Sequence, residues 1–270
     1  AGGAYVPLEP SYPLQRLQFM VEDTQVEQIV TITDKQSICQ ELNAQAVCVD
    51  QILALPEATL SLPEKAQLAI AAQGTEAEDP CYIVFTSGST GRPKSAAIPH
   101  RGIVRLVRSG PWIDFQESDI FLQHSAQSFD LSVFEIWGPL LNGAKVVIAP
   151  QGVLSLEELG SVVQQNRIST FWLTSGLFHQ MVNHRVKDLA KLKYLLVGGD
   201  IISAVHARRL LEQCPGVTMI CCYGPTENST FCTYRGLKCP ADIGERPLPI
   251  GRSLPNSTNY ILDDQLRELP

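Results

Sequence analysis

Apolar residues from Pro80 onward gather in short β-branched and aromatic runs, and these runs alternate with stretches of helical spacing. Short runs of this kind, bounded by turn residues, favour strands. The pattern predicts strands at Cys81–Phe85, Asp119–Leu122, Ala144–Ile148, Thr170–Leu173, Tyr194–Val197 and Val217–Cys222.

Helices are predicted between several of these strands. Ser155 and Glu158 have the spacing of a capping box, and apolar residues follow them at helical intervals. Further helices are expected near Gly102–Val107, at Ser132–Trp137 and from Ser203 to about Cys214. Strands that alternate with helices in this way indicate an α/β fold of mostly parallel sheets flanked by helices.

Two segments lack this alternation. Residues 55–80 contain prolines among small and acidic residues, which is typical of a connecting stretch. The sequence after Pro240 is also irregular, until an edge strand is predicted at Thr258–Leu262.

Composition places the chain among globular proteins. Its 270 residues can form one large domain or two modest ones, and 44% of them are hydrophobic. A net charge of −7 argues against a nucleic-acid partner or an anionic membrane surface. No apolar run reaches the roughly 18–20 residues of a membrane span.

The eight cysteines show neither a CxxC pair nor zinc-ligand spacing, so we expect reduced thiols in a cytoplasmic protein.

The run Thr86-Ser87-Gly88-Ser89-Thr90-Gly91-Arg92-Pro93-Lys94 has the composition of a phosphate-binding loop. Its glycines let backbone amides approach an anion closely, its hydroxyls donate hydrogen bonds, and Lys94 adds a positive charge. The spacing is not that of a Walker loop, because Gly91 is followed by Arg-Pro-Lys. Taken by composition alone, such a run is more often a solvated linker.

Polar clusters stand where the predicted strands end. Besides the glycine-rich run they are Phe129–Ser132, Thr174–Gly176, Gly198–Asp200 and Tyr223–Glu227. In open parallel sheets, ligands bind beyond the carboxyl ends of the strands. We therefore expect these five loops to converge on one edge of a sheet and to form a site there.

Two carboxylates in these loops are candidate ligand-binding groups. Glu227 could help to bind a magnesium ion that phosphates also hold, or it could be an ordinary exposed glutamate. Asp130 lies among apolar residues, where an unpaired charge is costly. It could cap the following helix. Otherwise it needs a cation, either from a distant part of the chain or from a ligand ammonium. The five histidines are scattered and stand beside no nucleophile, so we assign them structural roles.

Five motifs, in order and at matching spacing over essentially the whole chain, resemble the adenylation domains of nonribosomal peptide synthetases, which belong to the adenylate-forming superfamily. They are Ala1–Pro13 (AGGAYVPLEPSYP), Tyr82–Lys94 (YIVFTSGSTGRPK), Phe129–Ser132 (FDLS), Tyr223–Glu227 (YGPTE) and Pro249–Arg252 (PIGR). The resemblance implies a reaction in which an amino acid and ATP form aminoacyl-AMP and pyrophosphate. The acyl group then moves to a phosphopantetheine thiol on a carrier domain.

The resemblance also implies roles for individual residues. The loop Thr86, Ser87, Gly88, Ser89, Thr90, Gly91 and Lys94 would hold the β- and γ-phosphates, and Gly199, Asp200, Cys222, Tyr223, Gly224 and Thr226 would form the nucleotide side. Tyr223 would stack on adenine, Thr226 would bond the α-phosphate, and Glu227 would bind Mg²⁺. Lys94, Thr226 and Glu227 would act in catalysis. Asp130 would pair with the substrate ammonium.

The family's side-chain pocket maps to Asp130, Leu131, Phe134, Trp172, Leu196, Gly198, Cys222, Thr230 and Phe231. Apart from Asp130 this lining is uncharged and largely apolar, so a charged substrate side chain would find no counter-ion. Three aromatic rings occupy much of the volume. The pocket is similar to that of family members that activate valine. We therefore expect a small aliphatic amino acid, with valine as the first choice and isoleucine or leucine next.

The chain departs from the family pattern in places. Ser95 replaces a usual glycine, and Cys221 replaces an asparagine that commonly contacts adenine. We expect residues 1–270 to be the core of the N-terminal subdomain, with the C-terminal lid and its catalytic lysine beyond Pro270, and the 270-residue piece alone to be very weakly active. Expected partners are carrier and condensation domains and, in some systems, a small activator protein. The alternatives are an aryl or acyl-CoA ligase of the same superfamily, which would not need Asp130, and a non-catalytic binding module.

Overall fold

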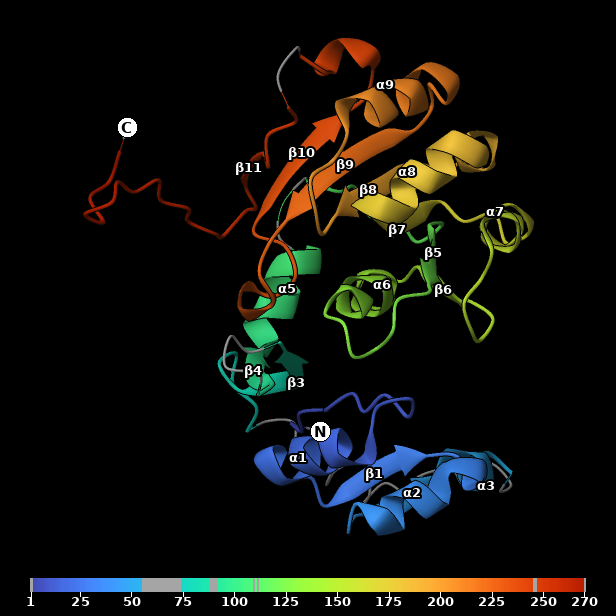
Figure 1. Cartoon of the computed structure of the whole chain (residues 1–270), viewed down its shortest axis with the longest axis vertical. Helices are drawn as coiled ribbons and strands as arrows, with labels where there is room; N and C mark the ends of the chain where they lie inside the picture. Colours follow the sequence, from blue (N-terminus) through green and yellow to red (C-terminus); the bar gives the residue numbers. More distant parts are fainter. Residues whose placement is uncertain are drawn as a thin grey trace. The chain divides into compact units, whose positions relative to one another are not determined.

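The computed structural model describes residues 2–54, 74–87, 92–108, 110, 112–244 and 247–269. The chain divides into two compact units, residues 1–100 and residues 101–270. Each unit is described by itself below, with its elements labelled as in Figure 1.

The first unit begins with a small α/β layer. Its elements are α1 (Leu14–Thr24), β1 (Gln28–Thr31), the 3₁₀ turn η1 (Thr33–Lys35), α2 (Gln36–Glu41), β2 (Gln45–Cys48) and α3 (Val49–Leu53). Strands β1 and β2 pair in parallel. Leu17, Val21 and Leu42 form a small core beneath them. The sequence pattern did not predict these elements, because the strands have four residues each and are only half-buried.

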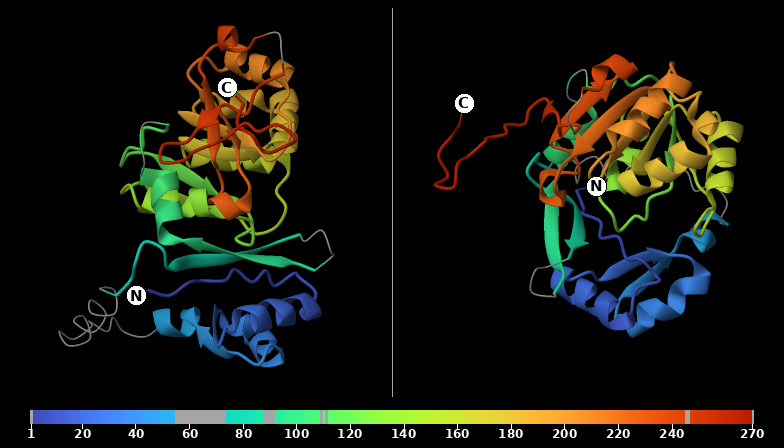
Figure 2. Two further views of the ribbon diagram at one scale, coloured as in Figure 1. Left: turned by 90° about the vertical axis from the view of Figure 1, so that its left-hand side faces the viewer. Right: turned by 45° about the horizontal axis from the view of Figure 1, so that its top comes forward.

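A β-hairpin completes the first unit (Figure 2). The predicted strand Cys81–Phe85 is present as β3 (Pro80–Thr86), but it pairs antiparallel with β4 (Lys94–Pro99). These two strands form their own two-stranded sheet. The prediction that the glycine-rich run follows a strand of the large parallel sheet is therefore wrong. Strand β4 escaped recognition because its six residues alternate poorly and only Ile98 is buried.

The second unit is built on a seven-stranded sheet with the order β11-β10-β9-β8-β7-β5-β6. The five predicted strands of this unit are confirmed as β5 (Ile120–Gln123), β6 (Lys145–Ile148), β7 (Thr170–Thr174), β8 (Tyr194–Gly198) and β9 (Thr218–Tyr223), and they are mutually parallel. Strands β10 (Thr233–Leu237) and β11 (Arg252–Ser253) add antiparallel to the β9 edge.

The helices that accompany the seven-stranded sheet include those predicted from the sequence. They are α5 (His100–Arg108), α6 (Leu131–Leu140), α7 (Leu156–Gln165), α8 (Ser175–His184) and α9 (Ala204–Gln213), with short 3₁₀ turns at Val186–Leu189 (η2), Thr226–Asn228 (η3) and Pro240–Asp242 (η4). The predicted capping box opens α7, since Ser155 Oγ accepts from the Glu158 amide at 3.2 Å and Glu158 Oε2 accepts from the Ser155 amide at 2.8 Å. Helix α8 was not predicted.

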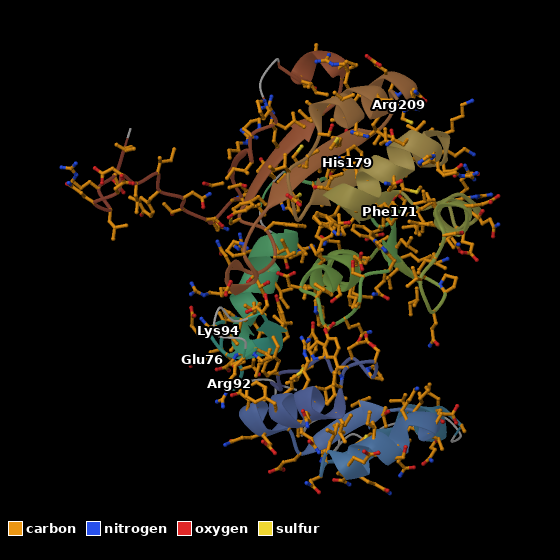
Figure 3. All side chains as sticks on the ribbon, in the orientation of Figure 1. Glu76, Arg92, Lys94, Phe171, His179 and Arg209 are labelled. Atoms are coloured by element: carbon orange, nitrogen blue, oxygen red, sulfur yellow. The ribbon has the colours of Figure 1, made fainter. Side chains whose placement is uncertain are left out.

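The two faces of the parallel sheet differ in what covers them. Helices α7, α8 and α9 cover one face (Figure 1), where Phe171, Leu195, Val197, Met219 and Cys221 join the main apolar core. Figure 3 labels Phe171 in this core and His179 on the covering helix α8. Side chains alternate along a strand, so the intervening residues of β7, β8 and β9 point to the opposite face.

The predicted edge strand at Thr258–Leu262 is absent from the structure. Residues 258–261 have no strand structure, and Leu262 makes only an isolated bridge to Glu268. The alternation of polar and apolar residues there resembles a strand, but Tyr260 and Ile261 are exposed and no sheet strand pairs with the segment. The short strand β11, which ends at Ser253, takes the position at the sheet edge.

Candidate functional site

Four of the predicted loops lie together at the carboxyl edge of the parallel sheet. They follow β5, β7, β8 and β9, which are neighbouring parallel strands, so the loops lie on the same edge. Asp130, Gly199 and Glu227 lie in three of them, and the predicted loop Thr174–Gly176 is a direct junction in which Thr174 ends β7 and Ser175 begins α8. The prediction that the loops converge on one edge of the sheet is confirmed for these four, and that they form a binding site stays a prediction.

The fifth loop, the glycine-rich run, connects β3 to β4 in the first unit. Gly88, Ser89, Thr90 and Gly91 lie outside the described residues. At the base of the loop, Thr86 pairs with Lys94 across the hairpin, and the Thr86 hydroxyl donates to the Lys94 carbonyl at 3.4 Å. The Lys94 side chain is exposed, as Figure 3 shows for Lys94 and Arg92. A cation next to a glycine-rich run is thus free to meet an anion.

Four of the predicted pocket residues lie on the sheet face opposite the main core. Trp172 pairs with Leu196, and Gly198 pairs with Cys222, across β7, β8 and β9. These side chains are buried. The neighbouring residue Cys221 points the other way into the main core, and burial raises the pKa of its thiol to about 11.

Gly198 provides space for the ring of Trp172. A Cβ at position 198 would stand 2.8 Å from Trp172 Cη2 and closer still to the Cys222 carbonyl oxygen. Both distances are shorter than van der Waals contact, so no larger residue fits without displacing the indole or the neighbouring strand.

Three buried aromatic rings form a continuous wall on this face. The centroid of the Phe231 ring lies 5.1 Å from that of Trp172 and 5.8 Å from that of Phe134. Phe134 comes from α6, and its ring also packs on Phe121 of β5. The three rings thus pack closely against one another and are nearly inaccessible to solvent.

Asp130 precedes the first residue of α6 but does not cap the helix with its side chain. The capping interpretation is therefore wrong. Its carboxylate accepts hydrogen bonds from the Thr226 hydroxyl and the Leu131 amide. Burial raises its pKa, and the nearby negative charge of Glu227 raises it further. Within the described part of the chain, Asp130 forms no ion pair with a lysine, arginine or histidine.

The segment after β9 brings the remaining candidates to Asp130. Thr226 and Glu227 lie in the turn η3, and Glu227 is exposed. The Thr230 hydroxyl donates to the backbone carbonyl of Asp130 at 3.0 Å. Gly224 is required here, because a Cβ at this position would stand 2.5 Å from the Thr230 carbonyl oxygen. Two segments that are 100 residues apart in sequence are thereby joined.

The candidates for nucleotide binding at Tyr223 and at Gly199–Asp200 are exposed to solvent. The Tyr223 side chain is 52% exposed at the end of β9. Gly199 adopts a φ of +81°, a Cβ at that position would have no heavy atom within 4 Å, and Asp200 beside it is exposed. The Ser175 hydroxyl donates to the carbonyls of Gly198 at 3.1 Å and Asp200 at 2.8 Å and thereby holds this turn.

The sequence pattern did not single out Glu135, a carboxylate of α6 that is only 2% exposed. It accepts from the amides of His124 at 3.2 Å and Ser125 at 3.0 Å and from the Ser125 hydroxyl at 2.8 Å. Burial raises its pKa to about 7. His124 Nε2 also lies 2.9 Å from the Trp172 carbonyl oxygen, and burial lowers the His124 pKa. A glutamate inside the apolar helix sequence was the available signal.

Two absences among the described residues limit the chemistry. These residues contain no group of three or more histidine, cysteine, aspartate or glutamate side chains arranged to hold a metal ion. A single carboxylate such as Glu227 still suits Mg²⁺ that arrives with phosphate oxygens. In the same residues no helix has both the length and the apolar character needed to cross a membrane.

Known proteins are similar to this chain over its whole length or nearly so. The chain is 43% identical to part of one of the linear gramicidin synthase subunits of Brevibacillus parabrevis and 38% identical to part of gramicidin S synthase 2 of Brevibacillus brevis. These matches cover 100% and 97% of the chain but only 3% and 6% of the synthases. The chain therefore spans a small fraction of these relatives.

Solved structures share the fold. One is holo-PA1221, described as an NRPS protein containing adenylation and PCP domains; it matches 99% of the chain with a TM-score of 0.84 at 31% identity, and the chain covers 44% of it. Another is the N-terminal subdomain of Klebsiella oxytoca NpsA with 3-hydroxybenzoyl-AMSN, with a TM-score of 0.82 at 25% identity, where the match covers 100% of the chain and 66% of that structure. The family described as AMP-binding enzyme matches residues 1–270, and the chain belongs to this adenylate-forming family, with the adenylation domains of nonribosomal peptide synthetases among its relatives.

Proposed function

We propose that the chain activates an amino acid with ATP as part of a nonribosomal peptide synthetase. The observation that carries the proposal is the environment of Asp130. Its carboxylate is partly buried, its pKa is raised, and no cation of the described residues pairs with it. A substrate ammonium would supply the missing positive charge and offset the cost of burying the carboxylate.

The reaction is a displacement at phosphorus. A carboxylate oxygen of the amino acid attacks the α-phosphorus of ATP and forms an acyl–phosphate bond, and the bond to the β-phosphate breaks to release pyrophosphate. The protein contributes mainly position and charge in such a step. Thr226, whose hydroxyl donates to the Asp130 carboxylate, would bind the α-phosphate when that carboxylate pairs with the substrate ammonium.

ATP and Mg²⁺ would bind to the exposed residues at the same edge of the sheet. The Tyr223 ring offers a face for adenine, with Gly199, Asp200, Cys222 and Gly224 beside it. Glu227 would bind Mg²⁺ together with phosphate oxygens, and the ion would neutralise the charge that develops on the phosphates. In the first unit, the Thr86–Lys94 loop would bind the β- and γ-phosphates through backbone amides and the Lys94 ammonium.

The pocket wall favours a small aliphatic side chain, and we propose valine. Phe134, Trp172 and Phe231 are packed on one another, and Leu131, Leu196, Cys222 and Thr230 add no charge. A charged substrate would lose its hydration without a counter-ion. Isoleucine and leucine come next, since one methylene changes the free energy of recognition by only about 1–3 kcal/mol.

The activated acyl group would pass to the phosphopantetheine thiol of a carrier domain, with a condensation domain as the next partner and an activator protein in some systems. The solved relative that contains both adenylation and PCP domains supports the carrier assignment. All eight cysteines are free, which suits a reducing cytoplasm.

Amino-acid-dependent exchange of labelled pyrophosphate into ATP tests the proposal on the full natural polypeptide that carries residues 1–270. Valine should give the highest rate, followed by isoleucine and leucine, and aspartate, lysine and phenylalanine should give little. Preference for a charged or large aromatic amino acid would refute the pocket assignment.

A carboxylic acid ligase is the second candidate function, because the Klebsiella oxytoca relative was solved with a hydroxybenzoyl compound. Asp130 distinguishes the two functions. Asp130→Ala should abolish exchange with valine if the ammonium binds there, whereas activity with benzoate or isovalerate should not fall. Nucleotide binding without exchange for any acid would indicate a non-catalytic binding module.

A further inference from the structure

Arg105 of α5 binds the backbone of a segment far away in sequence. Its Nη2 atom donates to the carbonyl oxygens of Asn228 at 2.6 Å, Ser229 at 3.2 Å and Phe231 at 2.8 Å. Its Nη1 atom donates to Ser257 Oγ at 2.7 Å. One guanidinium thus joins the helix to both the 228–231 segment and the loop after β11. Hydrogen bonds from a charged donor are among the stronger ones in proteins.

The segment that Arg105 binds has an unfavourable backbone. Ser229 has a φ of +54° and Thr230 a φ of +69°. For a β-branched residue such as Thr230 this left-handed conformation is rare and unfavourable, and it persists only where the surroundings impose it. Arg105 binds the carbonyls on both sides of Thr230, those of Ser229 and Phe231, and so stabilises the strained turn where it is needed.

The strained turn carries two parts of the candidate pocket. The Thr230 hydroxyl bonds the Asp130 carbonyl, and the Phe231 ring packs on Trp172 and Phe134. Both side chains are 2% exposed, so neither can adjust by moving into solvent. A shift of the turn would therefore displace the pocket wall and the backbone of Asp130 together.

We propose that Arg105 is a positioning residue for amino acid recognition. It fixes the left-handed turn at Ser229 and Thr230 and thereby sets the affinity and side-chain selectivity of the pocket, while ATP affinity depends mainly on residues outside this turn. The inference rests on the proposed amino acid activation. A general structural role would instead lower stability and affect both substrates alike.

Pyrophosphate exchange by the full natural polypeptide, with Arg105→Lys, tests the proposal. Lysine keeps the positive charge but lacks the planar fork that reaches several acceptors. We expect KM for valine to rise about tenfold or more, because small displacements in a site have large kinetic effects. KM for ATP should change less than about threefold, and discrimination between valine and isoleucine should weaken.

Arg108→Lys is the matched control. Arg108 lies one turn further along α5 and also binds a backbone carbonyl, that of Leu141 at 3.2 Å, together with Asn142 Oδ1 at 3.0 Å. It does not touch the 228–231 segment in the described contacts, so its replacement should leave both KM values unchanged. Equal effects of the two substitutions, or an equal rise in both KM values for Arg105→Lys, would overturn the proposal.

A second variant decides the case in which Arg105→Lys does not fold. Ser257→Ala removes only the partner of Nη1 and leaves the guanidinium in place. A rise of about two- to threefold in the valine KM alone supports positioning, and unchanged KM values refute it. Wild-type exchange with valine in the same assay tests the proposed function separately, since its absence would refute amino acid activation before any variant is compared.

Discussion

The indole of Trp172 lies against the backbone of Gly198, so that a Cβ at position 198 would stand 2.8 Å from Cη2 and closer still to the carbonyl oxygen of Cys222. The second contact is the more restrictive one. A side chain can rotate away, whereas the Cys222 carbonyl belongs to the parallel ladder that pairs β8 with β9. The floor of the proposed pocket therefore depends on the absence of a single methyl group.

Gly198→Ala should destabilise the protein by about 1–3 kcal/mol and strongly reduce valine-dependent exchange, because the added methyl overpacks a closed site. The additional substitution Trp172→Phe should not restore stability, since it relieves the ring contact but not the backbone contact. Gly236→Ala is the control, as nothing lies within 4 Å of a Cβ there. Urea denaturation and exchange rates measure both effects. Full rescue by Trp172→Phe would show that the backbone contact is unimportant.

Asp130 should make amino acid affinity depend on pH. Burial and then Glu227 raise its pKa in the free protein, so the carboxyl becomes protonated as the pH falls through that raised value. The protonated form cannot pair with an ammonium, and KM for valine should rise on the acid side, while KM for ATP stays flatter. Asp130→Asn should give a high KM for valine that no longer varies over this range. A valine KM of the wild type that stays constant with pH would contradict the assigned role.

Binding should also release protons at a pH low enough for Asp130 to be partly protonated in the free protein. An ammonium beside Asp130 favours its ionised form, so the pKa must fall when the amino acid binds. Calorimetry of valine binding in buffers of different ionisation enthalpy measures the number of protons released. Isovalerate, which lacks the amino group, is the matched ligand and should release none from this residue.

The five parallel strands of the large sheet were predictable because they are short, apolar runs, whereas the helix α8 and the antiparallel strands β10 and β11 were not predicted. Strand β4 was not predicted either, since its pairing with β3 satisfies the backbone without requiring an alternating sequence. The segment 258–262 shows the converse, because alternation predicts a strand only where a partner strand is available. Ser229 and Thr230 carry no sequence signal for a positive φ. Arg105 is 123 residues from Asn228, so the hydrogen bonds between Arg105 and the 228–231 segment depend on tertiary structure alone.

Glu135 should give stability a measurable pH dependence. Its pKa is about 7 in the folded protein against 4.5 for the ordinary group, because burial disfavours the charged form. Between these values the folded state holds a proton that the unfolded state has lost, so the free energy of unfolding falls as pH rises from 4.5 to 7 and levels off above 7. Linkage puts the contribution at about 3 kcal/mol.

Glu135→Gln removes this titration and keeps the shape of the side chain. The difference in unfolding free energy between wild type and variant should therefore shift with pH in the same range. Urea denaturation followed by tryptophan fluorescence suits the measurement, since Trp112, Trp137 and Trp172 all belong to the unit of residues 101–270. A pH-independent difference would show that Glu135 is ionised throughout.

Thiol reactivity should separate one cysteine from the other seven. Cys239 is exposed, whereas the remaining seven are buried. Burial raises the pKa of Cys221 to about 11 and that of Cys222 well above its ordinary value, so both hold their protons at neutral pH. Thiolate is the reactive species. Brief iodoacetamide treatment of the native protein followed by peptide mapping should label Cys239 first, and Cys239→Ser should remove that label. Equally fast labelling of Cys222 would mean that the pocket face is open to solvent, and the packed aromatic wall proposed to select valine would then be wrong.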